Sequence, residues 1–124
     1  MSAEVYSGNC GVSSADNVVW SLDTETGILT ISGVGEMENF SAFSYSPWYS
    51  YRSYVRTVSV AEGVTSIADY AFYRCTNLAD IKLPDSVTSI GKQAFYYCES
   101  LESIKLPDYV KYIHSETFSN CTSL

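Results

Sequence analysis

The sequence predicts an α+β repeat fold: a short solenoid of 23-residue repeats that follows an N-terminal cap containing a β-hairpin. Three observations lead to this prediction. Cys75, Cys98 and Cys121 are equally spaced along the chain. Apolar positions recur with the same period around them, whereas the first part of the chain does not follow the period. A fixed period in the twenties is typical of a solenoid, because each repeat buries its apolar side only against its neighbours.

Length and composition indicate a single domain and exclude some classes of partner. The 124 residues are 46% hydrophobic and 17% charged, which is enough to bury a core. The net charge of −7 disfavours nucleic acid and anionic membranes, since both attract basic patches. No apolar run approaches the roughly 18 residues of a membrane span, so we expect no membrane insertion. Met1 is followed by polar residues without a signal-peptide pattern, as in an intracellular protein or one trimmed of its leader.

The predicted cap, residues 1–54, begins with a polar stretch over 1–9 that we expect to fray. Apolar and polar residues alternate over 18–22 and again over 29–31. Between these runs lies a polar turn that ends at Gly27. Two alternating runs around such a turn predict a β-hairpin.

The second half of the cap is predicted to hold an irregular aromatic segment, 36–45, and then one short helix. Ser46 is expected to cap that helix, with Pro47 in its first turn. Trp48 and Tyr51 follow at helical spacing. We expect the cap to cover the apolar side that the first repeat leaves exposed.

The three predicted repeats are 55–77, 78–100 and 101–123. In each, the pattern LxxIxL predicts a strand, which Pro ends in the second and third repeats. The pattern VxxI predicts a second short extended piece, and AFxxC fits a helical turn with Phe and Cys on one face. Eight columns of matched residues result: Val55, Leu78, Leu101 and Leu124; Val58, Ile81 and Ile104; Val60, Leu83 and Leu106; Val64, Val87 and Val110; Ile67, Ile90 and Ile113; Ala71 and Ala94, broken by Thr117; Phe72, Phe95 and Phe118; and Cys75, Cys98 and Cys121.

The cysteines of the repeats are predicted to be buried thiols rather than disulfides. Side chains of equal phase on strands about 4.8 Å apart keep their Cβ atoms at least that far apart, beyond the ~3.8 Å of a disulfide. The absence of a CxxC motif and the single histidine, His114, disfavour zinc. We therefore expect no metal and no cofactor. Cys10 lies outside the repeats, and its redox state stays open.

Catalytic residues are not predicted, so we expect that the protein is not an enzyme. His114 and Cys121 could form a thiol–imidazole pair, but both occupy repeat phases that already explain them. The acidic turn 23–27 is similar to the start of a calcium loop. The EF-hand pattern then requires Glu at position 33, where this chain has Gly33. A plain hairpin turn is the better interpretation.

The repeat pattern LxxIxLPxxVxxIxxxAFxxCxx resembles the BspA-like (treponemal-type) leucine-rich repeat of bacterial surface proteins over residues 55–124. The segment DNVVWSLDTETGILTISGVGEM is similar to the non-repeat region that often precedes such repeats. The first repeat departs from the pattern at Ala61 and Ala68, which replace Pro and Gly, and the third has His114 in the phase of Gly91. The repeat position that Gly91 occupies therefore does not strictly require a positive φ.

The resemblance implies a leucine-rich-repeat fold and a secreted or cell-surface location, with host or matrix proteins as partners and no catalytic residues. In such repeats the strands line a concave sheet, and the outward strand positions are the usual contact surface. The alternative is a solvated face with charge pairs between neighbouring repeats. The predicted partner-binding residues on this concave strand face are Arg56, Thr57, Ser59, Asp80, Lys82, Glu102, Ser103 and Lys105.

A second candidate surface is aromatic: Tyr73, Tyr96 and Tyr97, close to Tyr70. Tyr is enriched at the cores of protein interfaces, which favours a contact surface. Alternatively, the rings cover the edge of the protein's own core.

Two functions from different classes fit these features. The first is a secreted or cell-surface module for protein–protein interaction or adhesion, without catalysis. The second is a structural spacer within a larger surface protein that has no ligand of its own. The sequence stops at Leu124, the first position of a fourth repeat, without a polar cap. This predicts a piece of a longer array, or an end-to-end homodimer through the uncapped last repeat.

Overall fold

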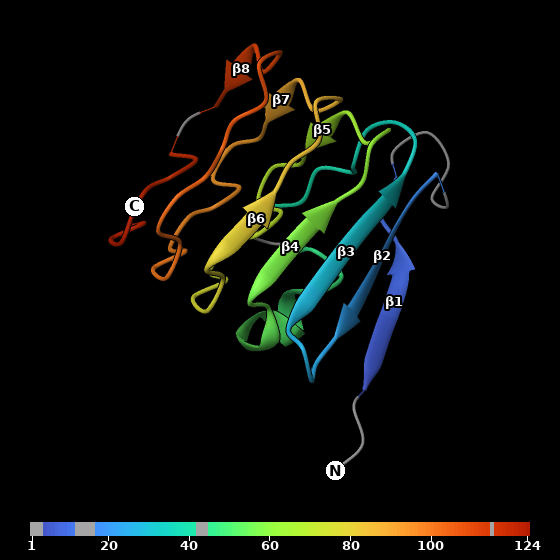
Figure 1. The fold of residues 1–124 in the computed structure, drawn as a ribbon, viewed down its shortest axis with the longest axis vertical. Helices are drawn as coiled ribbons and strands as arrows, with labels where there is room; N and C mark the ends of the chain where they lie inside the picture. Colours follow the sequence, from blue (N-terminus) through green and yellow to red (C-terminus); the bar gives the residue numbers. More distant parts are fainter. Residues whose placement is uncertain (1–3, 12–16, 42–44, 115) are drawn as a thin grey trace.

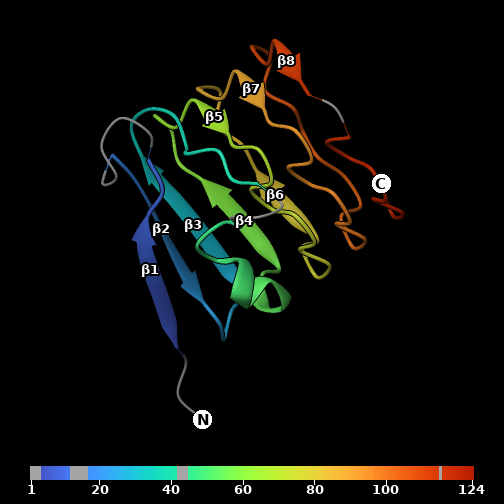
Figure 2. The same ribbon diagram turned by 180° about the vertical axis from the view of Figure 1, so that it is seen from behind.

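The computed structural model describes residues 4–11, 17–41, 45–114 and 116–124, which form two β-sheets and a short 3₁₀ helix. The five-stranded sheet has the order β1 (Val5–Asn9), β2 (Val18–Asp23), β3 (Ile28–Gly33), β4 (Thr57–Val60) and β6 (Asp80–Lys82). The three-stranded sheet has the order β5 (Ser66–Ile67), β7 (Ser89–Ile90) and β8 (Tyr112–Ile113). Figure 1 shows the short strands side by side above the longer sheet. The helix η1 (Tyr49–Tyr54) lies on the far face of that sheet in Figure 1, and so in front of the sheet in Figure 2.

The predicted hairpin is confirmed as β2 and β3, which pair antiparallel with Trp20 opposite Ile31. Its turn is held locally. The Asp23 carboxylate accepts a hydrogen bond from the backbone N–H of Glu25 at 2.9 Å. Gly27 closes the turn with a φ of 74°, in the left-handed region that glycine adopts without strain.

The prediction that residues 1–9 fray is wrong for residues 5–9. They form β1, which pairs antiparallel with β2 and places Tyr6 opposite Leu22. The Tyr6 ring also stacks on Tyr51 of η1, with 4.0 Å between the ring centres. This strand is held by backbone pairing and one aromatic contact, and neither shows in its polar composition.

Parallel pairing joins the hairpin to the repeats. Leu29 of β3 lies beside Val58 of β4, and Val58 lies beside Ile81 of β6. In the second sheet Ile67 pairs with Ile90, and Ile90 pairs with Ile113. Paired residues of β4 and β6 are 23 residues apart in the sequence, and so are paired residues of the three-stranded sheet. Each pair thus joins equivalent positions of successive repeats. The VxxI pieces therefore form strands, as predicted.

The third LxxIxL strand, predicted over 101–106, is not formed. Residues 101–107 form no strand, and β6 is the edge of the five-stranded sheet. Ile104 is half-buried, whereas its counterparts Val58 and Ile81 are buried. This stretch therefore has less of the packing that orders the earlier strands.

Aromatic stacking runs through the core as a continuous column. The ring centres of Phe72 and Phe95 are 5.4 Å apart, and those of Phe95 and Phe118 are 5.5 Å apart. Trp48 extends the column toward the N-terminus, 5.8 Å from Phe72. Phe72 and Phe95 are fully buried and Phe118 is half-buried. The predicted phenylalanine column is confirmed.

The helical turn predicted at AFxxC is wrong, because this segment forms successive turns that contain residues with positive φ. The N–H of Cys75 donates to the carbonyl of Phe72 at 3.1 Å, an i to i+3 bond. Arg74 lies within this turn and Tyr70 within the preceding one, with φ values of 59° and 58°, respectively. Backbone in the left-handed region does not continue a right-handed helix. The later repeats show the same feature at Gln93, Tyr97, Glu116 and Asn120.

The short helix predicted near Trp48 is present, but its predicted cap is wrong. It is the 3₁₀ helix η1, and the residue before it is Trp48, whose side chain makes no capping hydrogen bond. The N–H of Tyr49 instead donates to the backbone carbonyl of Ser46 at 3.0 Å. Because the Trp48 side chain is buried, core packing fixes where the helix begins.

Candidate partner-binding surfaces

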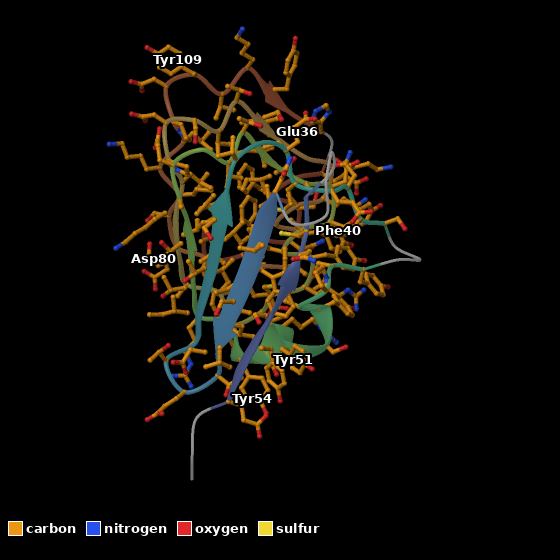
Figure 3. The ribbon with its side chains drawn as sticks, turned by 90° about the vertical axis from the view of Figure 1, so that its right-hand side faces the viewer. Glu36, Phe40, Tyr51, Tyr54, Asp80 and Tyr109 are labelled. Carbon is orange, nitrogen blue, oxygen red and sulfur yellow. The ribbon has the colours of Figure 1, made fainter. Side chains whose placement is uncertain are left out.

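The strand face is the outward side of the five-stranded sheet. Val58 and Ile81 are buried, so the alternate residues of β4 and β6 point away from the core. Figure 3 shows Asp80 on this side and Phe40 and Tyr51 on the opposite side of the sheet. The sequence pattern thus assigns the two sides correctly.

Five of the predicted contact residues come together on the strand face. Thr57 lies beside Asp80, and Ser59 lies beside Lys82, as paired residues of β4 and β6. Arg56 is exposed immediately before β4. The other three, Glu102, Ser103 and Lys105, are exposed but lie outside the sheet.

The hairpin continues the strand face, which the sequence pattern alone did not reveal. Ile28 pairs with Thr57, and Thr30 pairs with Ser59. The row of Thr57 and Asp80 and the row of Ser59 and Lys82 therefore both continue onto β3. Ile28 is 41% exposed, an apolar residue among small polar ones. The signal was present in the hairpin alternation, whose outward phase belongs to this face. A hollow of about 340 Å³ over β1, β2 and β3 carries side chains of Ser7, Ser21 and Thr30 in its lining.

The predicted aromatic surface of Tyr73, Tyr96 and Tyr97, called the tyrosine surface below, also includes Tyr45 and Tyr49. Tyr73 stacks on Tyr96 with 5.1 Å between ring centres, and Tyr96 lies 5.3 Å from Tyr97. Tyr45 and Tyr49 stack at 3.9 Å and lie 5.9 Å and 6.5 Å from Tyr73, respectively. A signal existed for Tyr49, because the pair Trp48–Tyr49 precedes Phe72–Tyr73 by close to one repeat length.

Two arginines border the tyrosine surface. The guanidinium carbon of Arg52 lies 4.1 Å from the centre of the Tyr49 ring. That of Arg74 lies 5.4 Å from Tyr73 and 5.6 Å from Tyr97. All three distances are within the range of cation–π attraction. Hydrogen bonding to Tyr73 raises the pKa of Arg74, so this guanidinium is charged at any physiological pH.

The thiol column is formed, and all four cysteines are free. The Cys98 thiol donates to the carbonyl of Phe72 at 3.2 Å, and the Cys121 thiol donates to that of Phe95 at 3.0 Å. Burial raises the pKa of Cys10 and of Cys75 to about 12, and it also raises the pKa of Cys98 and Cys121. A thiol that resists ionisation is a poor nucleophile and metal ligand.

Metal-binding geometry is not found among the described ranges, where no group of three His, Cys, Asp or Glu residues is placed to hold an ion. His114 lies on the surface with its ring 6.3 Å from that of Tyr112, and Cys121 hydrogen-bonds to Phe95. Within the same part of the chain, no helix has the length and apolar character needed to cross a membrane.

Solved structures of leucine-rich repeat proteins resemble this fold. A leucine-rich repeat protein from Eubacterium ventriosum is 28% identical with a TM-score of 0.78, over 94% of this chain and 30% of the other. A leucine-rich cell surface protein from Faecalibacterium prausnitzii is 26% identical with a TM-score of 0.55, over 98% and 35%. The T. pallidum leucine-rich repeat protein shares the fold at 24% identity and a TM-score of 0.54, over 90% and 68%. The chain spans about a third of the length of the first two.

Sequence comparison gives the family. No curated protein matches the chain significantly. The family described as "BspA type leucine rich repeat region (6 copies)" matches residues 43–124, which confirms the resemblance seen in the repeats. The match begins upstream of Val55 and so includes η1. It covers well over half of the sequence, including the parallel strands of the repeats and the phenylalanine column. The chain belongs to the BspA-type leucine-rich repeat family.

Proposed function

We propose that the chain is a non-catalytic module of a secreted or cell-surface protein and that it binds a host or matrix protein, as an adhesin does. The strand face is the proposed contact surface, with Arg56, Lys82 and the hydroxyl residues between them at its centre. The observation that carries the proposal is the alignment of side chains across strands: Thr30, Ser59 and Lys82 lie in one row. A row of this kind offers a partner regularly spaced polar groups on a rigid support.

The proposed architecture behind this surface is a solenoid of 23-residue repeats over 55–124, with residues 1–54 as its cap. The spacing of paired strand residues supports the repeat length. The parallel pairing of β3 with β4 supports the cap, because it continues the sheet into the hairpin.

Family membership also supports the proposal. Leucine-rich repeat domains generally mediate protein–protein interactions, and repeats of the BspA type typically occur in surface proteins. No catalytic family was identified for the chain. The Faecalibacterium prausnitzii structure is described as a cell surface protein, and its fold is similar to this one.

Charge reversal tests the strand face. The purified chain is immobilised, incubated with an extracellular-matrix extract, and its bound proteins are identified and then titrated individually. Lys82→Glu should weaken a captured partner about fivefold or more, with an unchanged melting temperature, because Lys82 is exposed. Lys111→Glu is the matched control, since Lys111 is exposed and lies outside both candidate surfaces. Equal binding by both variants would remove the strand face from consideration. Capture of nothing would favour the spacer function.

End-to-end pairing of two chains stays a prediction. Sedimentation equilibrium at rising protein concentration tests it directly, and a strict monomer at the highest concentration contradicts it.

A further inference from the structure

A cavity lined by two arginines and three hydroxyl-bearing residues lies beside the tyrosine surface. Its volume is about 450 Å³, and its lining consists of Ser50, Arg52, Ser53, Arg74 and Thr76. Two arginines and three residues with hydroxyl side chains thus border one space. Such a set matches the oxygen atoms of an anion, since guanidinium donates to carboxylates in a fixed forked geometry.

Among the residues that the structure describes, the two arginines of this cavity have no counter-ion. The protein carries 14 acidic and 7 basic residues, so carboxylates are plentiful. Nevertheless, within the described ranges neither Arg52 nor Arg74 forms an ion pair. Glu99 occupies the position in the second repeat that is equivalent to Thr76 in the first, and it forms no ion pair with Arg74 either. The positive charge of the cavity is left available to a ligand.

Both guanidinium groups lie beside tyrosine rings. Arg52 donates to the backbone carbonyl of Tyr49 at 3.0 Å while it lies over the ring of the same residue. Arg74 lies near the rings of Tyr73 and Tyr97. A side chain that is already positioned loses less conformational entropy when it binds.

We propose that the cavity between Arg52 and Arg74 binds the carboxylates of an acidic peptide segment on a protein partner. The proposal rests on the protein-binding function but places this contact on a different surface from the strand face. Tyr and Arg are the residues enriched in the energetically dominant parts of protein interfaces. A sulfated or acidic glycan fits less well. Sugars pack on open aromatic faces, whereas the ring faces of Tyr45 and Tyr49, and of Tyr73 and Tyr96, are turned toward each other.

An NMR titration with synthetic peptides tests the proposal. The probe is an octapeptide of glutamates, and an octapeptide of glutamines is its uncharged match. The glutamate peptide should shift the side-chain Nε–Hε signals of Arg52 and Arg74, and the glutamine peptide should not. The shifts should weaken with added salt, because the cavity is open to solvent.

Variants assign the binding to the cavity. Arg74→Gln should weaken the glutamate peptide about tenfold, as expected for the loss of a charge-assisted hydrogen bond. Arg74→Lys should retain part of the affinity, because it keeps the charge and loses the forked geometry. Lys111→Gln removes the same charge elsewhere and should bind normally. Unchanged two-dimensional spectra confirm that each variant is folded. Equal affinity of Arg74→Gln and the unmodified chain overturns the proposal.

Two further outcomes separate this proposal from others. Preferential binding of a heparin-derived hexasaccharide at the same arginine signals would overturn the peptide assignment. A captured protein partner that is lost with Lys82→Glu and retained with Arg74→Gln would support the strand face and overturn the role of the cavity. Loss with Arg74→Gln alone would support the cavity.

Discussion

The indole N–H of Trp48 donates a hydrogen bond to the backbone carbonyl of Ala71, with 2.7 Å between the heavy atoms. The Trp48 side chain is 1% exposed and contacts the rings of Trp20 and Phe72. One residue thus joins the N-terminal segment to the first repeat in two ways. Its ring fills the start of the phenylalanine column, and its polar atom satisfies a carbonyl of the neighbouring turn.

Replacement of Trp48 separates these two contributions. Trp48→Phe keeps an aromatic ring and removes the donor, so we expect a loss of about 1–3 kcal/mol in the free energy of unfolding. Trp48→Ala also opens a cavity and should cost about 3–5 kcal/mol. Urea denaturation followed by circular dichroism measures both. Tyr54→Phe is the control, because Tyr54 is 51% exposed and its loss should change little. Equal midpoints for Trp48→Phe and the control would contradict the role of the hydrogen bond.

The phenylalanine column should be strongest at its middle. Phe95 is fully buried between Phe72 and Phe118, so Phe95→Ala should cost about 3–5 kcal/mol. Phe118 is half-buried and stacks on one ring of the column, so Phe118→Ala should cost clearly less. Denaturation midpoints of the two variants give the comparison. An equal loss at both positions would show that the column does not depend on neighbours on both sides.

Gly91 gives a test in which the sequence and the structure disagree. Ala68 occupies the same repeat phase, so the sequence suggests that Gly91→Ala is harmless. In the structure, a Cβ on Gly91 would lie 2.6 Å from the backbone carbon of Ala68. Backbone atoms do not yield as a flexible side chain does, so we expect a loss of about 1–3 kcal/mol. Thermal denaturation measures it, and an unchanged melting temperature would show that the repeats can separate slightly without cost.

The buried thiols should make the fold sensitive to alkali. Burial raises the pKa of Cys75 to about 12, whereas an unfolded thiol ionises near pH 8.5. Between these values the unfolded chain has released a proton that the folded chain still holds, so stability is full below about pH 8.5 and falls as the pH rises. Each such thiol contributes a slope of about 1.4 kcal/mol per pH unit.

Urea denaturation from pH 7 to pH 10 in the presence of a reductant measures that slope. Cys75→Ala is the informative variant, because comparison with the unmodified chain cancels the contribution of the tyrosines. Its stability should fall less steeply with pH than that of the unmodified chain. Parallel curves would mean that Cys75 ionises in the folded protein as easily as in the unfolded one.

The sequence predicted those parts of the fold that follow from side-chain period. The spacing of Ile67, Ile90 and Ile113 predicted their pairing, and the same reasoning predicted the phenylalanine and cysteine columns. The sequence did not predict β1, because Val5–Asn9 has no strong apolar alternation and is held by pairing with β2. Nor did it predict the left-handed backbone at Tyr70 and Arg74, because neither residue type favours that conformation.

The candidate sites were predictable to the extent that they lie within one element. Alternation in β4 and β6 identified Ser59 and Lys82 as outward residues, and they are paired. Repeat phase identified the partners Tyr73 and Tyr96. The contribution of Arg52 requires the three-dimensional contact between the cap and the first repeat. Sequence spacing alone does not give that contact.

The recurring left-handed residues have a consequence for how this protein can change over generations. Backbone conformation at these positions repeats in every copy, while the residue types differ: Tyr, Gln and Glu at the first position, and Arg, Tyr and Asn at the second. Their side chains are half-buried or exposed, outside the buried columns. Substitutions at these positions can therefore change the side chains that each copy presents outside the core, while the buried columns keep their composition.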